Sequence, residues 1–233
     1  MRTVRTVTDL RGVLACARTG ERSIGLVPTM GALHEGHLSL IRHARANCDV
    51  VVVSLFVNPA QFNEGSDLER YPRGEDRDRQ LVASVGGDVL FAPSVEEVYP
   101  AGFATAVEVL GLTERLEGQA RGAEHFRGVT TVVTKLLCMA MPDVAYFGKK
   151  DAQQVAVIRR LVEDLNLAVA IEALPTVREP DGLAMSSRNL LLSQVERSRA
   201  RALPAALGAA LQRARAGEVS AAALVGAARE EML

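Results

Sequence analysis

The chain has 233 residues, of which 48% are hydrophobic, and a formal net charge of -1 at pH 7. A chain of this length can bury one core, or one core and a smaller second domain. The small charge, the lack of tryptophan and the few aromatics give no basis for binding nucleic acid. No stretch approaches the roughly 18 apolar residues of a membrane helix, and three scattered cysteines are typical of a reducing compartment. We therefore expect a cytoplasmic protein with no signal peptide and no membrane partner.

The chain opens with a predicted helix over residues 8–19, whose N-cap is expected at Thr8 or Asp9. A buried strand then begins at Ile24, and a glycine-containing turn leads to a helix that His37 opens. Strand, turn and helix N-terminus in succession are a common way for α/β proteins to present backbone N–H groups to phosphate. This stretch therefore predicts a phosphate-binding site.

The spacing within this turn excludes two familiar sites. Gly31 and Gly36 are spaced as in a P-loop, but His37 stands where that motif requires lysine. His34 and His37 are one residue too close for the zinc-protease pattern, and no third ligand lies at a recognisable spacing. Two surface histidines at a helix start are a simpler alternative. The pair instead resembles the His-x-x-His signature of nucleotidyltransferases, whose imidazoles contact the phosphates of ATP.

Polar residues follow the next predicted strand. Residues 49–57 form a β-branched run with the pattern of a parallel strand that is buried on both faces. Asn58 and Gln61 come directly after it, at the edge where open α/β sheets bind ligands. They are candidates for a neutral hydrogen-bonding pocket, and a plain Asn-Pro turn is the alternative. The charged loop over residues 64–78 is either solvated surface or an active-site flap.

The middle of the chain alternates between expected helices, strands and loops. A helix is predicted over residues 78–85, a short strand over 87–92 and a weakly alternating edge strand over 104–110. Residues 116–128 contain too much glycine and charge to pack, so we expect a flexible connection there. The apolar stripe after them predicts a helix that Pro142 ends.

A second strand, turn and helix follow, over residues 143–147, 148–151 and 152–165. The turn contains Lys149 and Lys150. Ammonium groups beside a helix N-terminus are electrostatically suited to a triphosphate. The turn is therefore a second candidate for phosphate binding.

Hydroxyl and guanidinium groups come together after the last predicted strand, over residues 168–174. Ser186, Ser187 and Arg188 combine neutral donors with a planar, always charged fork, which suits a phosphate. A polar turn without function is the alternative. The composition changes over residues 177–189, where we expect the domain boundary, and alanine-rich helices follow.

Five ordered motifs carry a specific resemblance. They occupy residues 28–37, 56–62, 71–73, 147–154 and 182–189. In this order and spacing they resemble the motifs of the pantothenate synthetase (pantoate–β-alanine ligase) family, over nearly all of residues 1–200. The resemblance implies an α/β fold, with a Rossmann-like parallel sheet and helices on both faces in residues 1–176. Residues 177–233 would begin a smaller C-terminal lid domain, which in the family continues past this point.

The resemblance also implies a two-step reaction. Pantoate and ATP would give pantoyl adenylate and pyrophosphate, and β-alanine would then attack to give pantothenate and AMP. Mg²⁺ is the implied ion on the phosphates, and a homodimer is the implied assembly. Two alternatives remain open, namely an ATP-binding fragment with no activity or half of it, and another acid-adenylating or nucleotidyl transferase of the same superfamily.

The matched motifs assign roles residue by residue. The residues implied in catalysis are His34, His37, Lys150 and Arg188. Those implied in binding ATP are Met30, Gly36, Gly148, Lys150, Asp151, Val177, Met185, Ser186, Ser187 and Arg188. Gln61 and Gln154 are implied in binding pantoate. Asp78 is implied in placing the metal, with Asp76 as an alternative.

The chain departs from the family pattern at three places. Lys149 stands where glutamate is common, and Ala152 stands where an aromatic residue is common. Arg121 and His125 resemble a loop that reaches the active site, but they enclose one residue more than the usual spacing.

Overall fold

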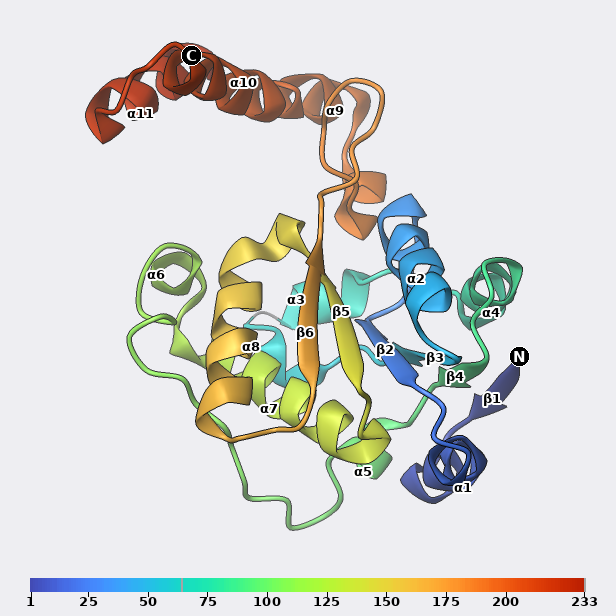
Figure 1. Ribbon diagram of the computed structural model, residues 1–233. Coiled ribbons are helices and arrows are strands. Elements are labelled where there is room, and N and C mark those ends of the chain that lie inside the picture. The colour runs from blue at the N-terminus through green and yellow to red at the C-terminus, as the bar shows by residue number, and fades with distance from the viewer. Residues whose placement is uncertain (64, 233) are drawn as a thin grey trace. The chain divides into compact units, whose positions relative to one another are not determined.

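The computed structural model describes residues 1–63 and 65–232. The chain forms two compact units, Met1–Pro175 and Thr176–Leu233. The first unit contains a six-stranded parallel sheet with helices on both faces (Figure 1). The predicted α/β class and the predicted parallel sheet are therefore confirmed.

The two predicted phosphate-binding turns follow neighbouring strands in the middle of the sheet. The strands are β1 (Arg2–Val4), β2 (Ile24–Thr29), β3 (Val50–Leu55), β4 (Val89–Phe91), β5 (Val144–Gly148) and β6 (Ala170–Leu174). They lie in the order β1-β4-β3-β2-β5-β6. From β2 the chain adds β3 and β4 on one side, and it then adds β5 and β6 on the other. This reversal creates a topological switch point between β2 and β5, where open α/β sheets bind ligands.

Helices connect these strands. They are α1 (Val7–Thr19), α2 (Glu35–Asn47), α3 (Gly65–Arg70), α4 (Glu75–Ser84), α5 (Val95–Val98), α6 (Glu117–Arg121), α7 (Ala123–Ala140) and α8 (Ala152–Asp164), with the 3-10 helices η1 (Pro59–Gln61) and η2 (Lys149–Asp151). Within the described ranges, no helix has both the length and the apolar character needed to cross a membrane.

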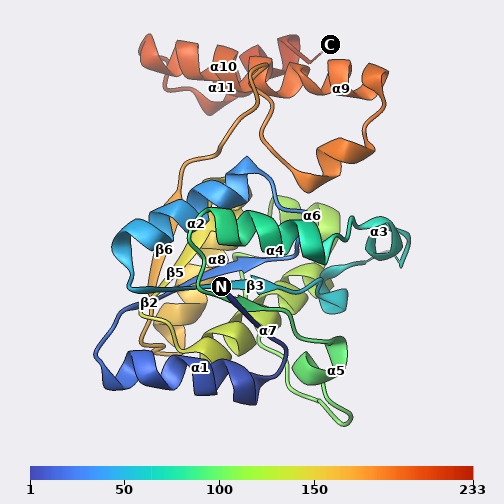
Figure 2. The same cartoon turned by 90° about the vertical axis from the view of Figure 1, so that its right-hand side faces the viewer.

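Two helical layers bury the sheet (Figure 2). Helices α1, α7 and α8 pack on one face, through residues such as Leu14, Leu136 and Ile158. Helices α2 and α4 pack on the opposite face, through residues such as Ile41 and Val82. The valines of β3 are consequently buried on both sides, as its continuous β-branched run predicts.

Two helices begin at other residues than predicted. The N-cap of α1 is Thr6, whose side chain accepts a hydrogen bond from the Asp9 N–H at 3.0 Å, so the prediction of Thr8 or Asp9 was wrong. Helix α2 begins at Glu35, with His34 as its N-cap, and His37 lies in its first turn rather than opening it. In both cases an extended residue upstream caps the helix with its own side chain.

Two segments pack differently from the prediction. Residues 104–110, all of them described, form no strand, and the Val107 N–H donates to the Thr131 hydroxyl at 3.0 Å instead. Residues 116–128, expected to be flexible, contain α6 and the start of α7. A Cβ on Gly118 would lie 1.8 Å from the carbonyl oxygen of Thr113. This glycine therefore permits close packing of the backbone and does not indicate a flexible segment.

The charged loop over residues 64–78 and the N-terminus also contain structure that was not predicted. From residue 65 onward the loop forms α3 and then the start of α4, whereas residue 64 lies outside the described residues. The N-terminal β1 pairs in parallel with β4 at the edge of the sheet.

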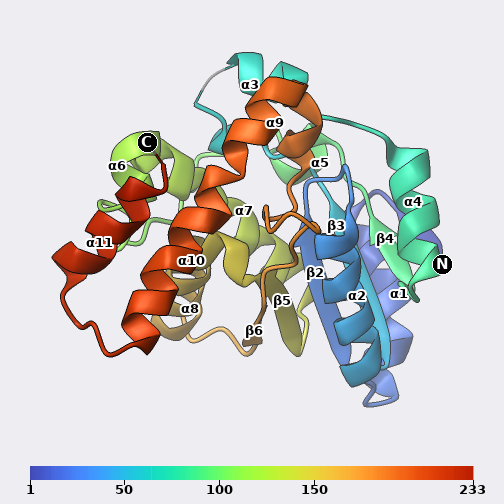
Figure 3. The same cartoon turned by 90° about the horizontal axis from the view of Figure 1, so that it is seen from above.

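The second unit is mostly helical. It contains η3 (Ser187–Leu191), α9 (Gln194–Ala200), α10 (Ala202–Arg215) and α11 (Ala221–Glu230). Helices α10 and α11 lie side by side (Figure 3). Ser220 caps α11 by accepting a hydrogen bond from the Ala223 N–H. Before these helices, Arg178 and Ala184 form an isolated antiparallel bridge.

Candidate active site

The turn between β2 and α2 has a strained backbone. Gly31 and Ala32 both have positive φ values, of 89° and 50°. A Cβ on Gly31 would also lie 2.9 Å from the Leu55 side chain, so only glycine fits there. Ala32 carries a Cβ in the left-handed region, which costs roughly 1–2 kcal/mol and persists only where the surroundings hold it. Some other group must therefore fix this turn.

Asp78 on α4 is that group. Its two carboxylate oxygens accept hydrogen bonds from the backbone N–H groups of Ala32 and Leu33, each at 2.8 Å. The residue is only 1% exposed, so water does not compete for these bonds. Hydrogen bonds to an ionised acceptor are among the strongest in proteins. Asp78 thus holds the turn that leads into His34, a role that the sequence analysis did not predict.

The metal role predicted for Asp78 stays a prediction. Both of its carboxylate oxygens already accept hydrogen bonds from the turn. The alternative, Asp76, is exposed and lies 3.5 Å from Arg79. Across the residues that the structure describes, no three His, Cys, Asp or Glu side chains gather to hold a metal ion. Mg²⁺ is commonly held by one or two carboxylates together with substrate phosphates. The lack of such a group is therefore compatible with the predicted Mg²⁺, which stays a prediction.

His34 and His37 cap the start of α2 with their rings. Nδ1 of His34 accepts from the Gly36 N–H at 3.1 Å, and Nδ1 of His37 accepts from the His34 N–H at 3.3 Å. The ring centroids are 4.1 Å apart. A neutral imidazole whose Nδ1 accepts a hydrogen bond carries its own hydrogen on Nε2. Both rings therefore present an Nε2–H donor, the group that a phosphate oxygen requires, while the N–H of Gly36 is used within the cap.

The turn after β5 brings Lys150 close enough to act on His37. Burial, together with the smaller electrostatic effects of the neighbouring His34 and Lys150, lowers the pKa of His37 to about 3. His37 is therefore neutral at pH 7 and binds as a hydrogen-bond donor rather than as a cation. Lys150 lies on η2, and its ammonium is 3.2 Å from the carboxylate of Asp151. Gly148 ends β5 and forms the N-cap of η2.

Gln61 lies beside the end of β2. Its Nε2 is 3.0 Å from the Sδ atom of Met30, which joins the predicted pantoate residue to a predicted ATP residue. Gln154 is half-buried in the first turn of α8, four residues after Lys150. Strands β3, β2 and β5 are neighbours in the sheet (Figure 1). Gln61, the two histidines and Lys150 follow these three parallel strands, so they belong to the same edge of the sheet.

The remaining predicted residues belong to the second unit. Ser186 caps η3 by accepting from the Arg188 N–H at 3.3 Å, and Ser187 is buried. The Met185 N–H donates to the Val177 carbonyl at 3.0 Å, which aligns these two residues across a short hairpin. The structure thus brings these five residues together within their own unit, and their roles toward ATP stay predictions.

The comparisons with known proteins decide the family. The model of the family described as pantoate-beta-alanine ligase matches residues 2–233. The chain belongs to this family. The pantothenate synthetase of Moorella thermoacetica is 53% identical over 100% of this chain and 82% of its own length. That of Cereibacter sphaeroides is 57% identical over 92% of this chain and 77% of its own.

Solved structures of family members have the same fold. The crystal structure of pantothenate synthetase from Thermus thermophilus matches with a TM-score of 0.94 and 50% identity, over 100% of this chain and 82% of that chain. Pantoate-beta-alanine ligase from Francisella tularensis matches with a TM-score of 0.85 and 37% identity, over 99% of this chain and 86% of that chain. The second was solved in complex with Beta-gamma ATP and beta-alanine.

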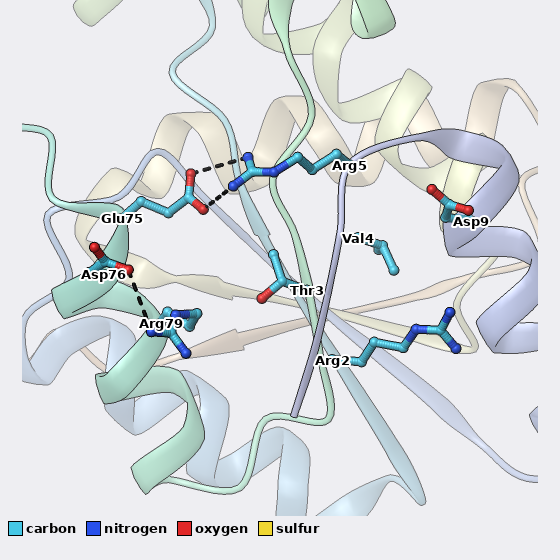
Figure 4. Close-up of a pocket in the computed structure, with 8 residues that line it drawn as sticks. All are labelled: Arg2, Thr3, Val4, Arg5, Asp9, Glu75, Asp76 and Arg79. Atoms are coloured by element: carbon cyan, nitrogen blue, oxygen red, sulfur yellow. Dashed lines mark hydrogen bonds and ion pairs between the residues drawn. The ribbon is translucent and has the colours of Figure 1, made fainter.

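A cavity of about 590 Å³ lies beside β1, the edge strand of the sheet (Figure 4). Its lining contains none of the residues predicted to bind phosphate or pantoate. Its lining is formed by Arg2, Thr3, Val4, Arg5, Asp9, Glu75, Asp76 and Arg79. The guanidinium of Arg5 makes a two-pronged ion pair with Glu75, and Arg79 faces Asp76 at 3.5 Å. These charges compensate one another, and the first pair joins the end of β1 to the start of α4.

The 3-10 helix η1, which carries Gln61, is clamped against α7. Nδ1 of His125 lies 2.7 Å from the carbonyl oxygen of Gln61. A Cβ on Gly128 would lie 2.2 Å from the carbonyl oxygen of Ala60, so the two backbones touch there. His125 was predicted on a loop near the site, and Gly128 at the end of a segment expected to be flexible. The role of Gly128 depends on its contact with Ala60, which no local sequence pattern reveals.

Proposed function

We propose that this chain joins pantoate to β-alanine at the expense of ATP, through a pantoyl adenylate, with release of pyrophosphate and AMP. The observation that carries the proposal is one edge of the sheet, where the turns with His34 and His37, with Lys150 and with Gln61 follow neighbouring parallel strands. Its membership of the pantoate-beta-alanine ligase family supports the same reaction. So does the relative from Francisella tularensis, solved with Beta-gamma ATP and beta-alanine.

In the first step the substrate supplies the nucleophile. A carboxylate oxygen of pantoate attacks the α-phosphorus of ATP, and the bond from that phosphorus to the bridging oxygen of pyrophosphate breaks. Such a step needs alignment of the reactants and stabilisation of charge on the phosphates. Lys150 contributes a positive charge, and His34 and His37 contribute donors. Because His37 is neutral, it stabilises the leaving phosphates without giving up a proton.

The acid-binding pocket distinguishes pantoate from a phosphorylated acid. Gln61 and Gln154 provide neutral amides, which suit the hydroxyl and carboxylate oxygens of pantoate. A phosphorylated substrate would need arginine or lysine in their place. The two glutamines therefore favour an acid-adenylating ligase over a nucleotidyl transferase that acts on phosphate esters.

In the second step the amine of β-alanine attacks the acyl carbon of the adenylate. The bond from that carbon to the phosphate oxygen breaks, AMP leaves and the amine loses a proton to solvent. We propose that Ser186, Ser187 and Arg188 bind phosphate oxygens, and that the second unit acts as a lid. Mg²⁺ enters as the complex with ATP, and the working protein is a cytoplasmic homodimer.

The deciding experiment is exchange of labelled pyrophosphate into ATP, with Mg²⁺ and pantoate but without β-alanine. Exchange that requires pantoate is the expected result. Its absence, with ATP still bound in calorimetry, would show a nucleotide-binding protein that lacks the first half-reaction. Exchange supported equally by unrelated acids would show a different acid substrate. Gln154→Ala should raise the KM for pantoate well above any change in the KM for ATP.

A further inference from the structure

Asn58, the N-cap residue of η1, has a buried side chain that makes four hydrogen-bond contacts. It is 1% exposed. Its Oδ1 lies 2.8 Å from the hydroxyl of Tyr99 and 3.3 Å from the N–H of Ala60. Its Nδ2 lies 3.0 Å from Oε1 of Gln61 and 3.1 Å from the carbonyl oxygen of Gly128. Every donor and acceptor of this amide is therefore used.

Two of these partners fix which way the Asn58 amide faces. The backbone N–H of Ala60 can only donate, so the atom facing it is the oxygen. The carbonyl of Gly128 can only accept, so the atom facing it is the nitrogen. With this orientation fixed, the Tyr99 hydroxyl must donate to Oδ1, and Gln61 must offer its oxygen to Nδ2.

The same logic orients the functional end of Gln61. Because its Oε1 is held by Asn58, its NH₂ group faces the other way, where Met30 lies 3.0 Å from Nε2. A glutamine free to rotate would offer oxygen or nitrogen with similar ease. Held in this way, Gln61 offers donors, which match the carboxylate and hydroxyl oxygens of an acid substrate.

We propose that Tyr99 is a positioning residue for the reaction, which acts through Asn58 to hold the Gln61 carboxamide with its NH₂ group toward the acid substrate. The inference rests on the proposed function, since it takes Gln61 to bind pantoate. Tyr99 follows α5 and reaches the site from a segment remote in sequence. Burial raises its pKa to about 12, so its hydroxyl keeps the proton it donates throughout the working pH range.

The surroundings of the Tyr99 ring offer a matched control. The ring packs edge-on against Phe103 with centroids 5.1 Å apart, and the ammonium of Lys135 lies 5.8 Å from the Tyr99 centroid. Lys135→Met changes the contacts of the ring and leaves the hydroxyl in place. Tyr99→Phe removes the hydroxyl and leaves the ring. Comparison of the two variants separates hydrogen bonding from packing.

The test is pyrophosphate exchange with pantoate varied at saturating ATP, and then with ATP varied. Tyr99→Phe should raise the KM for pantoate by roughly fivefold to tenfold, the effect of one net hydrogen bond, and leave the KM for ATP within twofold. Lys135→Met should leave both unchanged. In a Gln61→Ala background, Tyr99→Phe should have no further effect on the KM for pantoate, because its route to the substrate is gone.

Three outcomes would contradict these ideas in distinguishable ways. Pantoate-dependent exchange in the wild type, with an unchanged KM in Tyr99→Phe, overturns the inference alone. An effect of Tyr99→Phe that persists in full with Gln61→Ala shows a merely structural role and overturns it as well. No exchange by the wild type overturns the proposed function, and the inference with it.

Discussion

Replacing Asp78 by asparagine tests whether one carboxylate holds the turn that leads into His34. The asparagine oxygen can accept from one of the two backbone N–H groups now bound at 2.8 Å. Its NH₂ group then faces the other N–H, so a hydrogen bond is replaced by a contact between two donors. A hydrogen bond to a charged group contributes about 1.5–3 kcal/mol. The lost hydrogen bond and the donor–donor contact together should lower the free energy of unfolding by roughly 2–4 kcal/mol.

Urea unfolding followed by circular dichroism measures this loss, and pyrophosphate exchange measures its effect on the site. Without the carboxylate, the positive φ of Ala32 is no longer held, and the His34 ring moves with the turn. A displacement of about 1 Å in a catalytic group can cost about 10²-fold in rate. Asp76→Asn is the control, because this exposed side chain on the same helix has only a 3.5 Å pair with Arg79. It should change stability by less than about 0.5 kcal/mol.

The opposite result would support the predicted metal role of Asp78. If Asp78→Asn is as stable as the wild type and its exchange rate recovers at raised Mg²⁺, the carboxylate serves the ion rather than the turn. A loss of stability that raised Mg²⁺ does not repair supports the structural role.

Three further predictions concern other parts of the site. The pKa of His37 is lowered to about 3 in the folded protein. Below about pH 6.5 the unfolded chain therefore binds one proton more than the folded chain does. The free energy of unfolding should fall by up to about 1.4 kcal/mol per pH unit from there down to about pH 3. His37→Asn should flatten this slope in urea titrations at pH 7, 6 and 5, and an equal slope in both proteins would contradict the lowered pKa. Gly128→Ala should destabilise by about 1–3 kcal/mol and raise the KM for pantoate, because its Cβ would lie 2.2 Å from a carbonyl oxygen. Gly12→Ala, in a helix where a Cβ meets nothing within 4 Å, should instead stabilise by about 0.5–1 kcal/mol, and similar thermal shifts in both variants would refute the packing argument. Lys150→Ala should lower the exchange rate by roughly 10²-fold, whereas Lys149→Ala should lower it by less than about threefold, and equal losses would show that only net charge matters.

The sequence predicted the central strands and the long helices because these have strong local patterns. The β-branched run of β3 and the apolar stripes of α7 and α8 are visible without any tertiary information. β1 has only three residues and one fully buried side chain, Val4, so no periodicity exists to detect. The glycines near residues 116–128 misled the prediction, since Gly118 and Gly128 allow close packing where flexibility was expected.

The candidate site was predictable where its residues follow strands. Lys150 comes soon after β5, and His34 and Gln61 lie in the connections after β2 and β3, so the parallel sheet brings them to one edge. Asp78 and Tyr99 were not assigned these contacts because they act over 45 and 41 positions of sequence, on Leu33 and Asn58. Asp78 lies in a charged helix and Tyr99 precedes a proline. Neither local sequence indicates that the side chain will bind a buried amide group.

The use of His34 as a helix cap has a consequence for how this protein can change. Serine, threonine, aspartate and asparagine are the preferred N-cap residues, and histidine is not among them. His34→Ser would therefore leave α2 intact while it removes the imidazole from the proposed phosphate site. A library screened only for expression or heat resistance would accept such a replacement readily. Folding alone does not preserve the histidine, so only selection on the chemistry can keep it there.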